Sequence, residues 1–218
     1  ETFVRFGAPA EVAYLNKPHI GSDRLRTVLK NIRKYICGHG GEFAFHTRLE
    51  DVVLREGVLR SVMLKNVKTG ETYEEEASEV VLAIGHSSRD TFSMLECRGF
   101  AMQAREFAVG VRIEHLQEKI GFAQYSVTHK LLPSADYKLV SHAGGRTAFT
   151  FCMCPGGYVM PAASEEGGVV TNGMSDYARD GRNANSALLV QIKRSDFDCG
   201  NVLDGVEFQR KIERAAYA

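Results

Sequence analysis

The sequence predicts a protein of mixed α/β and α+β class. Three observations lead to this prediction. A helical apolar stripe begins near Ser22, and an alternating apolar pattern with two glycine-bearing turns follows it. An apolar run at residues 79–85 then ends at Gly85, and a second helical pattern comes after it. Helices that alternate with buried strands are typical of α/β domains, whereas closely spaced alternating strands indicate antiparallel pairing.

Composition limits the classes of partner. The 218 residues contain 27 Lys and Arg against 27 Asp and Glu, so no net basic field would attract nucleic acid. The sequence has no membrane-length apolar run and no signal-peptide pattern. Its five cysteines, an odd number at irregular spacing, are typical of free thiols in a reducing compartment. We therefore expect a cytoplasmic protein with a small-molecule substrate, without nucleic-acid or membrane partners, and of an oligomeric state that the sequence does not indicate.

The first predicted helix has apolar residues at helical spacing from Leu25 to Ile36. Ser22 or Asp23 can cap its start, and the stretch GHGG at residues 38–41 ends it.

After this helix the apolar period changes to two. Turns at Glu56-Gly57 and at residues 68–70 separate the strand candidates, which predicts a small antiparallel meander. The meander leads into residues 79–85, whose nearly continuous apolar character suits a strand buried on both faces of a parallel sheet.

The end of that strand is the first candidate site. A glycine there lets the backbone approach a dinucleotide, and the N-terminus of the next helix, predicted at residues 91–97 behind a Ser-x-x-Asp capping box, faces its anionic groups. The alternative is an ordinary turn with capping serines. The cofactor-binding residues predicted here are Ala83, Gly85, His86, Ser87 and Arg89.

The second half of the chain reads as short strands joined by turns. Residues 107–115 alternate like a strand, residues 116–120 suit a short helix, and residues 187–192 fit either a strand or a helix. A last helix is predicted from Asp204 or Gly205. Further strand candidates lie at residues 137–140, 147–153, 158–160 and 168–172.

Several stretches, which reach across most of the chain, carry a family resemblance. They lie at residues 16–33, 80–92, 107–115, 151–159 and 172–190. Together they resemble a family of bacterial FAD-dependent dehydrogenases within the glutathione-reductase-type flavoproteins. In that superfamily the corresponding strand commonly ends in Ala-Thr-Gly, where this chain has Ala83-Ile84-Gly85. The resemblance implies FAD as the cofactor and NADH or NADPH as a candidate electron donor.

The G-x-G-x-x-G fingerprint that cradles the pyrophosphate is missing from the sequence. In the family it lies upstream, and the closing part of the flavin domain lies downstream. We therefore expect an internal-to-C-terminal fragment that binds FAD weakly or not at all on its own. The resemblance implies a partial FAD/NAD(P)-binding domain at residues 1–104, an inserted substrate or cap domain of mixed α+β structure at 105–206, and a helix at 207–218 that returns to the FAD domain.

Cys152 and Cys154 form a C-x-C pair. On a regular strand both thiols would face one side, yet an extended backbone holds the sulfurs too far apart for an easy disulfide. A redox pair or half a metal site is one interpretation, and plain packing of buried thiols is the favoured one. No second cysteine or histidine cluster completes a zinc site, so we predict no metal.

The turn Pro155-Gly156-Gly157 and the following Tyr158 form another candidate. Two glycines permit a tight backbone path, and a tyrosine offers a flat face with a polar tip. The turn would lie against the isoalloxazine ring, with Gly156 and Gly157 binding the cofactor, or it is a simple hairpin turn with Tyr158 half buried.

Arg112, Glu114 and His115 lie at the end of an alternating strand. Arg112 and Glu114 share one face and would either pair in solvent or leave Arg112 to clamp a substrate carboxylate. His115 is a surface histidine or a proton-transfer group.

Residues 172–186 are dense in amides, hydroxyls and charges, as either an exposed loop or a binding segment would be. We select Asn183 and Asn185 as cofactor-binding candidates.

The function predicted from the sequence is flavin-mediated hydride or electron transfer by an FAD-dependent oxidoreductase, of which this fragment alone would be inactive. Its catalytic residues are not identified, and the weak candidates are Arg112, His115, Cys154 and Tyr158. The alternative is a ligand-binding or regulatory protein that kept the fold without turnover.

Overall fold

Every strand pair that the structure describes is antiparallel. The structure is a computed structural model, and it describes residues 1–198 and 200–218. The predicted mixture of helices and strands is confirmed, with antiparallel sheets throughout the described residues.

The chain divides into two compact units. The larger unit contains residues 1–41, 106–196 and 209–218, and the smaller unit contains residues 42–105 and 197–208. Residues 1–41 group with 106–196 and not with the meander, and the predicted domain assignment stays a prediction.

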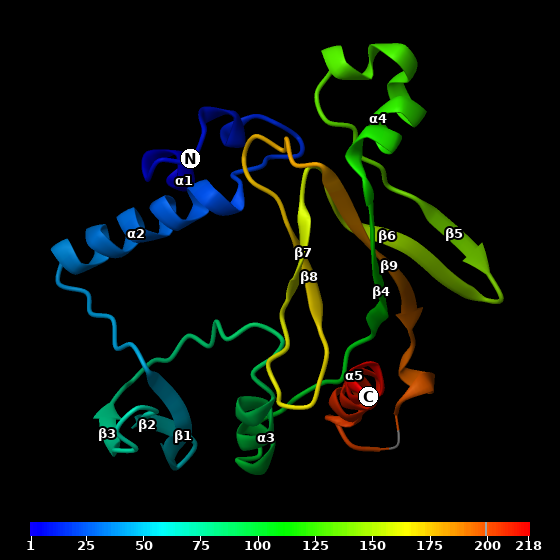
Figure 1. Ribbon diagram of the computed structural model, residues 1–218. Coiled ribbons are helices and arrows are strands. Elements are labelled where there is room, and N and C mark those ends of the chain that lie inside the picture. The colour runs from blue at the N-terminus through cyan, green and yellow to red at the C-terminus, as the bar shows by residue number, and fades with distance from the viewer. Residues whose placement is uncertain (199) are drawn as a thin grey trace. The chain divides into compact units, whose positions relative to one another are not determined.

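The larger unit is built on a four-stranded sheet with the order β4-β9-β6-β5 and a separate β7-β8 ribbon (Figure 1). Its strands are β4 (Phe107–Leu116), β5 (Val140–Ala143), β6 (Arg146–Cys154), β7 (Tyr158–Pro161), β8 (Thr171–Met174) and β9 (Asn183–Ile192). Its helices are α1 (Thr2–Arg5), η1 (Ala10–Ala13), α2 (Ser22–Gly38), α4 (Gln117–Tyr125), η2 (Ser126–Leu131) and η3 (Arg194–Asp196), and the unit boundary falls within α5 (Asp204–Tyr217).

Strand β9 occupies the centre of this sheet, where it pairs along its length with β4 and then with β6. Four consecutive β9 residues, from Ala184 to Ala187, are buried. The predicted ambiguity at residues 187–192 is thus resolved as strand. The reason is tertiary, because two neighbouring strands satisfy the backbone groups on both edges of β9.

Helix α2 confirms the predicted helix and its end near the glycines at 38–41. The predicted side-chain cap is wrong, because Gly21 is the N-cap residue. Asp23 instead accepts a hydrogen bond from the backbone N–H of Tyr177 at 2.9 Å, and the N–H of Ser22 donates to the carbonyl of Ser175 at 3.0 Å. The helix start therefore holds the loop after β8 in place, and the Tyr177 N–H lowers the pKa of Asp23.

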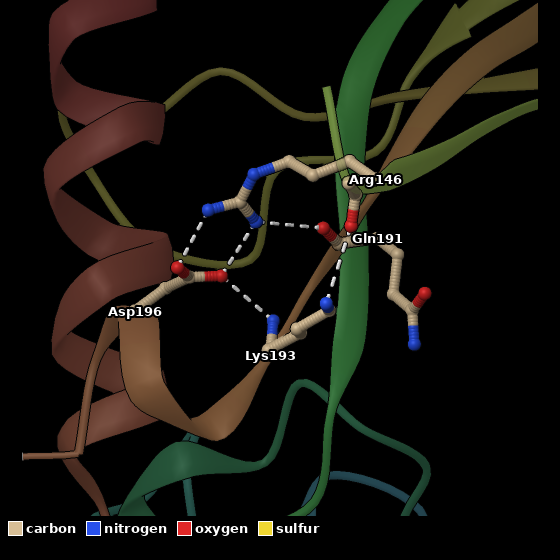
Figure 2. Close-up of polar contacts among 5 residues, drawn as sticks. Arg146, Gln191, Lys193 and Asp196 are labelled. Atoms are coloured by element: carbon tan, nitrogen blue, oxygen red, sulfur yellow. Dashed lines mark hydrogen bonds and ion pairs between the residues drawn. The ribbon is translucent and has the colours of Figure 1, made fainter. Parts of the chain in front are cut away.

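An ion pair ties the β5–β6 hairpin to the end of β9 (Figure 2). Both terminal nitrogens of Arg146 bond the carboxylate of Asp196 at 2.7 Å, and Nη1 also donates to the carbonyl of Gln191 at 3.2 Å. The backbone N–H of Lys193 donates to the same carboxylate at 2.8 Å. The Arg146 guanidinium, followed by the Lys193 N–H, lowers the pKa of Asp196 to about 2.

The smaller unit contains the predicted meander. Strands β1 (Thr47–Arg55), β2 (Val58–Asn66) and β3 (Thr72–Glu76) pair in that order, with turns at the predicted places. Helix α3 (Arg89–Cys97) confirms the helix predicted at 91–97. Arg98, which follows α3, pairs with Asp51 on β1 and fixes the helix end to the meander.

The buried parallel strand predicted at residues 79–85 is wrong. This stretch has no strand structure, and Val80, Val81 and Leu82 are exposed, with Val81 at 91%, while Ile84 is half-buried. An apolar run shows only that side chains favour burial, whereas a strand also requires a neighbour to bond its backbone. No described strand pairs with residues 79–85.

The capping box predicted before α3 is also wrong. Ser88 is the N-cap residue, but its hydroxyl donates to the carbonyl of Ile84 at 2.9 Å instead of capping the helix. Asp90 accepts a hydrogen bond from the N–H of Thr91. The serine therefore stabilises the turn that precedes the helix.

We expect Asp196→Asn to lower stability at neutral pH, by a small amount because the pair lies near the surface. The folded pKa of Asp196 is depressed, so its stabilisation is present above about pH 4, the unfolded pKa, and is lost as the pH falls toward 2. The stability difference between the wild type and this variant should therefore shrink over that range. Urea unfolding at several pH values measures it, and Asp180→Asn, at an exposed carboxylate, is the control. An unchanged difference at low pH would contradict this assignment.

Candidate functional site

Two asparagines of β9 hold the charged residues of β4. Nη1 of Arg112 donates to Oδ1 of Asn185 at 2.6 Å, and Nδ2 of Asn183 donates to Oε1 of Glu114 at 2.6 Å. The predicted pairing of Arg112 with Glu114 is therefore wrong. The register explains this, because Glu114 lies opposite Asn185 and each charged side chain reaches an asparagine on the neighbouring strand.

Asn185 lies at the centre of this arrangement with 0% of its surface exposed. A side chain at Gly173 on β8 would clash with Oδ1 of Asn185 and with Nη1 of Arg112, and it would approach the Cys154 sulfur. Glycine at position 173 thus leaves room for the Arg112–Asn185 bond. Strand β8 closes the site on that side.

The end of β6 departs from regular strand geometry at Cys152. Its φ is +46°, in the left-handed region, and the pairing with β9 slips between Phe151 and Cys154. The predicted alternation, with both thiols on one side of an extended strand, therefore does not hold. Cys152 is exposed, and the thiol of Cys154 donates to the carbonyl of Cys152 at 3.2 Å.

Burial raises the pKa of both thiols, and the charge of Arg112 opposes this effect at each of them. Arg112 also donates to the carbonyl of Cys152 at 3.4 Å. The raised pKa values keep both groups predominantly as thiols near neutral pH, which disfavours a nucleophilic role.

The turn at residues 155–157 packs against the loop that precedes β9. A side chain at Gly156 would clash with the backbone carbonyl of Arg179, and a side chain at Gly181 would clash with the carbonyl of Gly156. The N–H of Gly156 donates to Oε1 of Gln117 at 3.0 Å. Packing within the chain accounts for the glycine at 156, and its contact with a cofactor stays a prediction.

Tyr158 is 45% exposed and pairs with Met174 in the β7-β8 ribbon. His115 bonds the hydroxyl of Tyr137 through Nε2 at 2.7 Å, and both residues are half-buried. The two side chains share one hydrogen bond, and a proton can be held or passed along it.

Several residues that complete the site were not among those selected from the sequence. Their partners are distant in sequence, so no local spacing indicates the contacts of Tyr137, Gln117 and Arg179. Gly173 and Gly181 are recognisable only from the backbone that each one approaches.

The residues predicted at the first site lie in the smaller unit. Gly85 has φ +70°, and nothing lies within 4 Å of the position that a Cβ would take there. The hydroxyl of Ser87 bonds Nδ1 of His86 at 2.7 Å, and Arg89 is buried. Ala83 is exposed. The backbone around Gly85 is thus open to a ligand.

Two surveys of the described residues bear on ligand classes. No group of three or more His, Cys, Asp or Glu among them is placed to hold a metal ion. None of their helices combines the length and apolar character needed to span a membrane.

Comparison with known proteins places the chain in a family. Residues 106–218 match the family described as "FAD-dependent protein, C-terminal domain-like". The match covers more than half of the 218 residues, and the chain belongs to this family. An uncharacterized protein of Clostridium beijerinckii is 47% identical over 221 residues. The alignment covers 100% of this chain and 40% of that relative, so the chain spans about two fifths of the relative's length.

Gly156→Ala should destabilise the larger unit more than Gly144→Ala. Both glycines have nearly the same φ, +58° and +59°, so each alanine costs about 1 kcal/mol in backbone strain. Only position 156 adds a clash with the Arg179 backbone, for which we expect about 2 kcal/mol more. Urea unfolding of both variants measures the difference, and equal losses would show that the loop yields without cost.

Proposed function

We propose that this chain is part of an FAD-dependent oxidoreductase. The observation that carries the proposal is the family match over residues 106–218, a segment that contains β4, β6 and β9 and therefore the polar cluster of Arg112 and Asn185. Bound FAD would supply hydride or electron transfer, while the protein supplies binding, orientation and electrostatics.

The residues present suit such a cofactor in two places. In the smaller unit, the open backbone at Gly85 permits close approach of a ligand. In the larger unit, Arg112 and Asn185 carry N–H groups without acceptors among the described residues, and donors of this kind stabilise anionic groups. In this proposal the His115–Tyr137 pair serves as the proton-holding group.

The complete gene product, purified without added cofactor, tests the proposal. We expect visible absorption from bound oxidised flavin, and bleaching by NADH or NADPH would identify the electron donor. A colourless protein that also fails to take up added FAD would overturn the assignment. It would favour a ligand-binding protein that kept the fold without redox turnover.

A matched pair of glycine variants tests the site at Gly85. Gly85→Ala and Gly57→Ala place the same side chain at φ values of +70° and +76°, each with no atom of the chain within 4 Å. Both should cost about 1 kcal/mol in stability. Only Gly85→Ala should lower the FAD content of the complete protein, by about tenfold or more, because its methyl group occupies the approach path. The flavin-to-protein absorbance ratio measures this, and equal ratios in the two variants would remove Gly85 from the site.

A further inference from the structure

Arg112 carries a positive charge that no described carboxylate balances. Its two hydrogen-bond acceptors, Oδ1 of Asn185 and the carbonyl of Cys152, are both neutral. Glu114 lies on the same face of β4 but bonds Asn183. Arg112 is half-buried, so solvent screens its charge only in part.

A second arginine in the same unit has the same character. Arg179 is half-buried with φ +52°, and the hydroxyl of Ser134 bonds its carbonyl at 2.8 Å, which fixes its backbone. No described carboxylate forms an ion pair with it. The charges of Arg112 and Arg179 both lower the pKa of Cys154 against the larger effect of burial, so both arginines lie within electrostatic range of one thiol.

The unsatisfied polar atoms of the cluster are all donors. Nε of Arg112, Nε of Arg179 and Nδ2 of Asn185 are buried and bond no described residue. Native proteins leave few buried donors unpaired, since each one costs about 1–3 kcal/mol. A negatively charged acceptor would both satisfy these three N–H groups and balance the two positive charges.

A purely structural role for Arg112 explains part of this arrangement. The bonds to Asn185 and Cys152 tie β4 to β9 and to the irregular end of β6. Both of these acceptors are neutral, so the two bonds require an N–H donor but no positive charge. Structural bracing does not account for a second arginine whose backbone packs against the turn that follows Cys154, nor for buried donors without an acceptor among the described residues.

We propose that Arg112, Asn185 and Arg179 form an oxyanion-binding site that takes one carboxylate or phosphate group. Arginine presents several donors in a planar fork, which matches the oxygens of either group. Arg112 bonds the carbonyl of Cys152, and Cys152 is exposed, so one side of the cluster adjoins a residue at the surface. The inference deepens the proposed function by naming the chemical class of its ligand, an anionic substrate or the phosphates of a cofactor.

Titration of the isotopically labelled chain with small anions tests the site without flavin. Acetate and succinate form one arm, phosphate and pyrophosphate the other, and chloride keeps the ionic strength constant. We expect saturable shifts of the Nε–H signals of Arg112 and Arg179 in at least one arm. Saturation by carboxylates alone assigns the site to a substrate carboxylate, and saturation by phosphates alone assigns it to a phosphate group.

Arg112→Gln should weaken this binding about ten- to a hundredfold, as expected for losing a charge-assisted hydrogen-bond donor. Arg112→Lys should restore part of it, because the charge returns without the planar fork. Arg26→Gln, which removes an exposed positive charge from α2 in the same unit, is the matched control and should bind like the wild type. Should Arg112→Gln fail to fold, as circular dichroism would show, Arg179→Gln on the loop before β9 replaces it.

Shifts that never saturate, or that persist unchanged in the glutamine variants, would overturn the site. The two proposals can fail separately. If the complete protein contains flavin but none of the four anions binds to the larger unit, only the oxyanion site is disproved. If anions bind saturably and through Arg112 but the protein never takes up FAD, only the proposed function is disproved.

Discussion

The larger unit depends on the double pairing of β9. This strand bonds β4 on one edge and β6 on the other, so it positions the contacts that join Arg112 and Glu114 to the rest of the sheet. Asn185 and Ser186 are 0% exposed although both are polar, which is tolerable only because their side chains find partners across the sheet. Without β9 in this register, Arg112 on β4 and the end of β6 would have no common neighbour.

Close backbone contacts then fix the loops around the sheet. The turn after β6 and the loop before β9 meet at Gly156 and Gly181, where neither backbone leaves room for a side chain. The start of α2 bonds the loop after β8 through Ser22 and Asp23. These contacts join segments far apart in sequence, and they hold the Arg179 backbone against the turn that follows Cys154. The cluster is thus a product of the fold as a whole and not of one motif.

Local signals in the sequence predicted the elements that local physics determines. Helix α2 followed from its apolar spacing and its terminal glycines, and the meander turns followed from glycine-bearing pairs such as Glu56-Gly57. The prediction failed where a distant partner decides the outcome. Residues 79–85 looked like a buried strand because apolar side chains favour burial, but a strand also needs a neighbour. Asp23 was a predicted helix cap, but its carboxylate accepts a hydrogen bond from the N–H of Tyr177 instead.

The candidate site shows the same division. Arg112 was selected from its residue type and its place on an alternating strand, and Asn183 and Asn185 from residue type and the family resemblance. The structure bonds Arg112 to Asn185 and Asn183 to Glu114 across β4 and β9. Their partners could not be predicted, because cross-strand register depends on where each strand begins. A one-residue shift of β9 would turn Asn185 to the other face of the sheet.

Charge balance connects this geometry with the family. The family match covers residues 106–218, and within that segment β4 and β9 carry Arg112 and Asn185, while the loop between β8 and β9 carries Arg179. A fold that needed only to brace β4 against β9 could do so with neutral side chains, since both acceptors of Arg112 are neutral. Two half-buried arginines without carboxylate partners among the described residues cost stability unless an anion offsets them. An anion held between these residues, as we propose, would offset that cost without any change in the sheet.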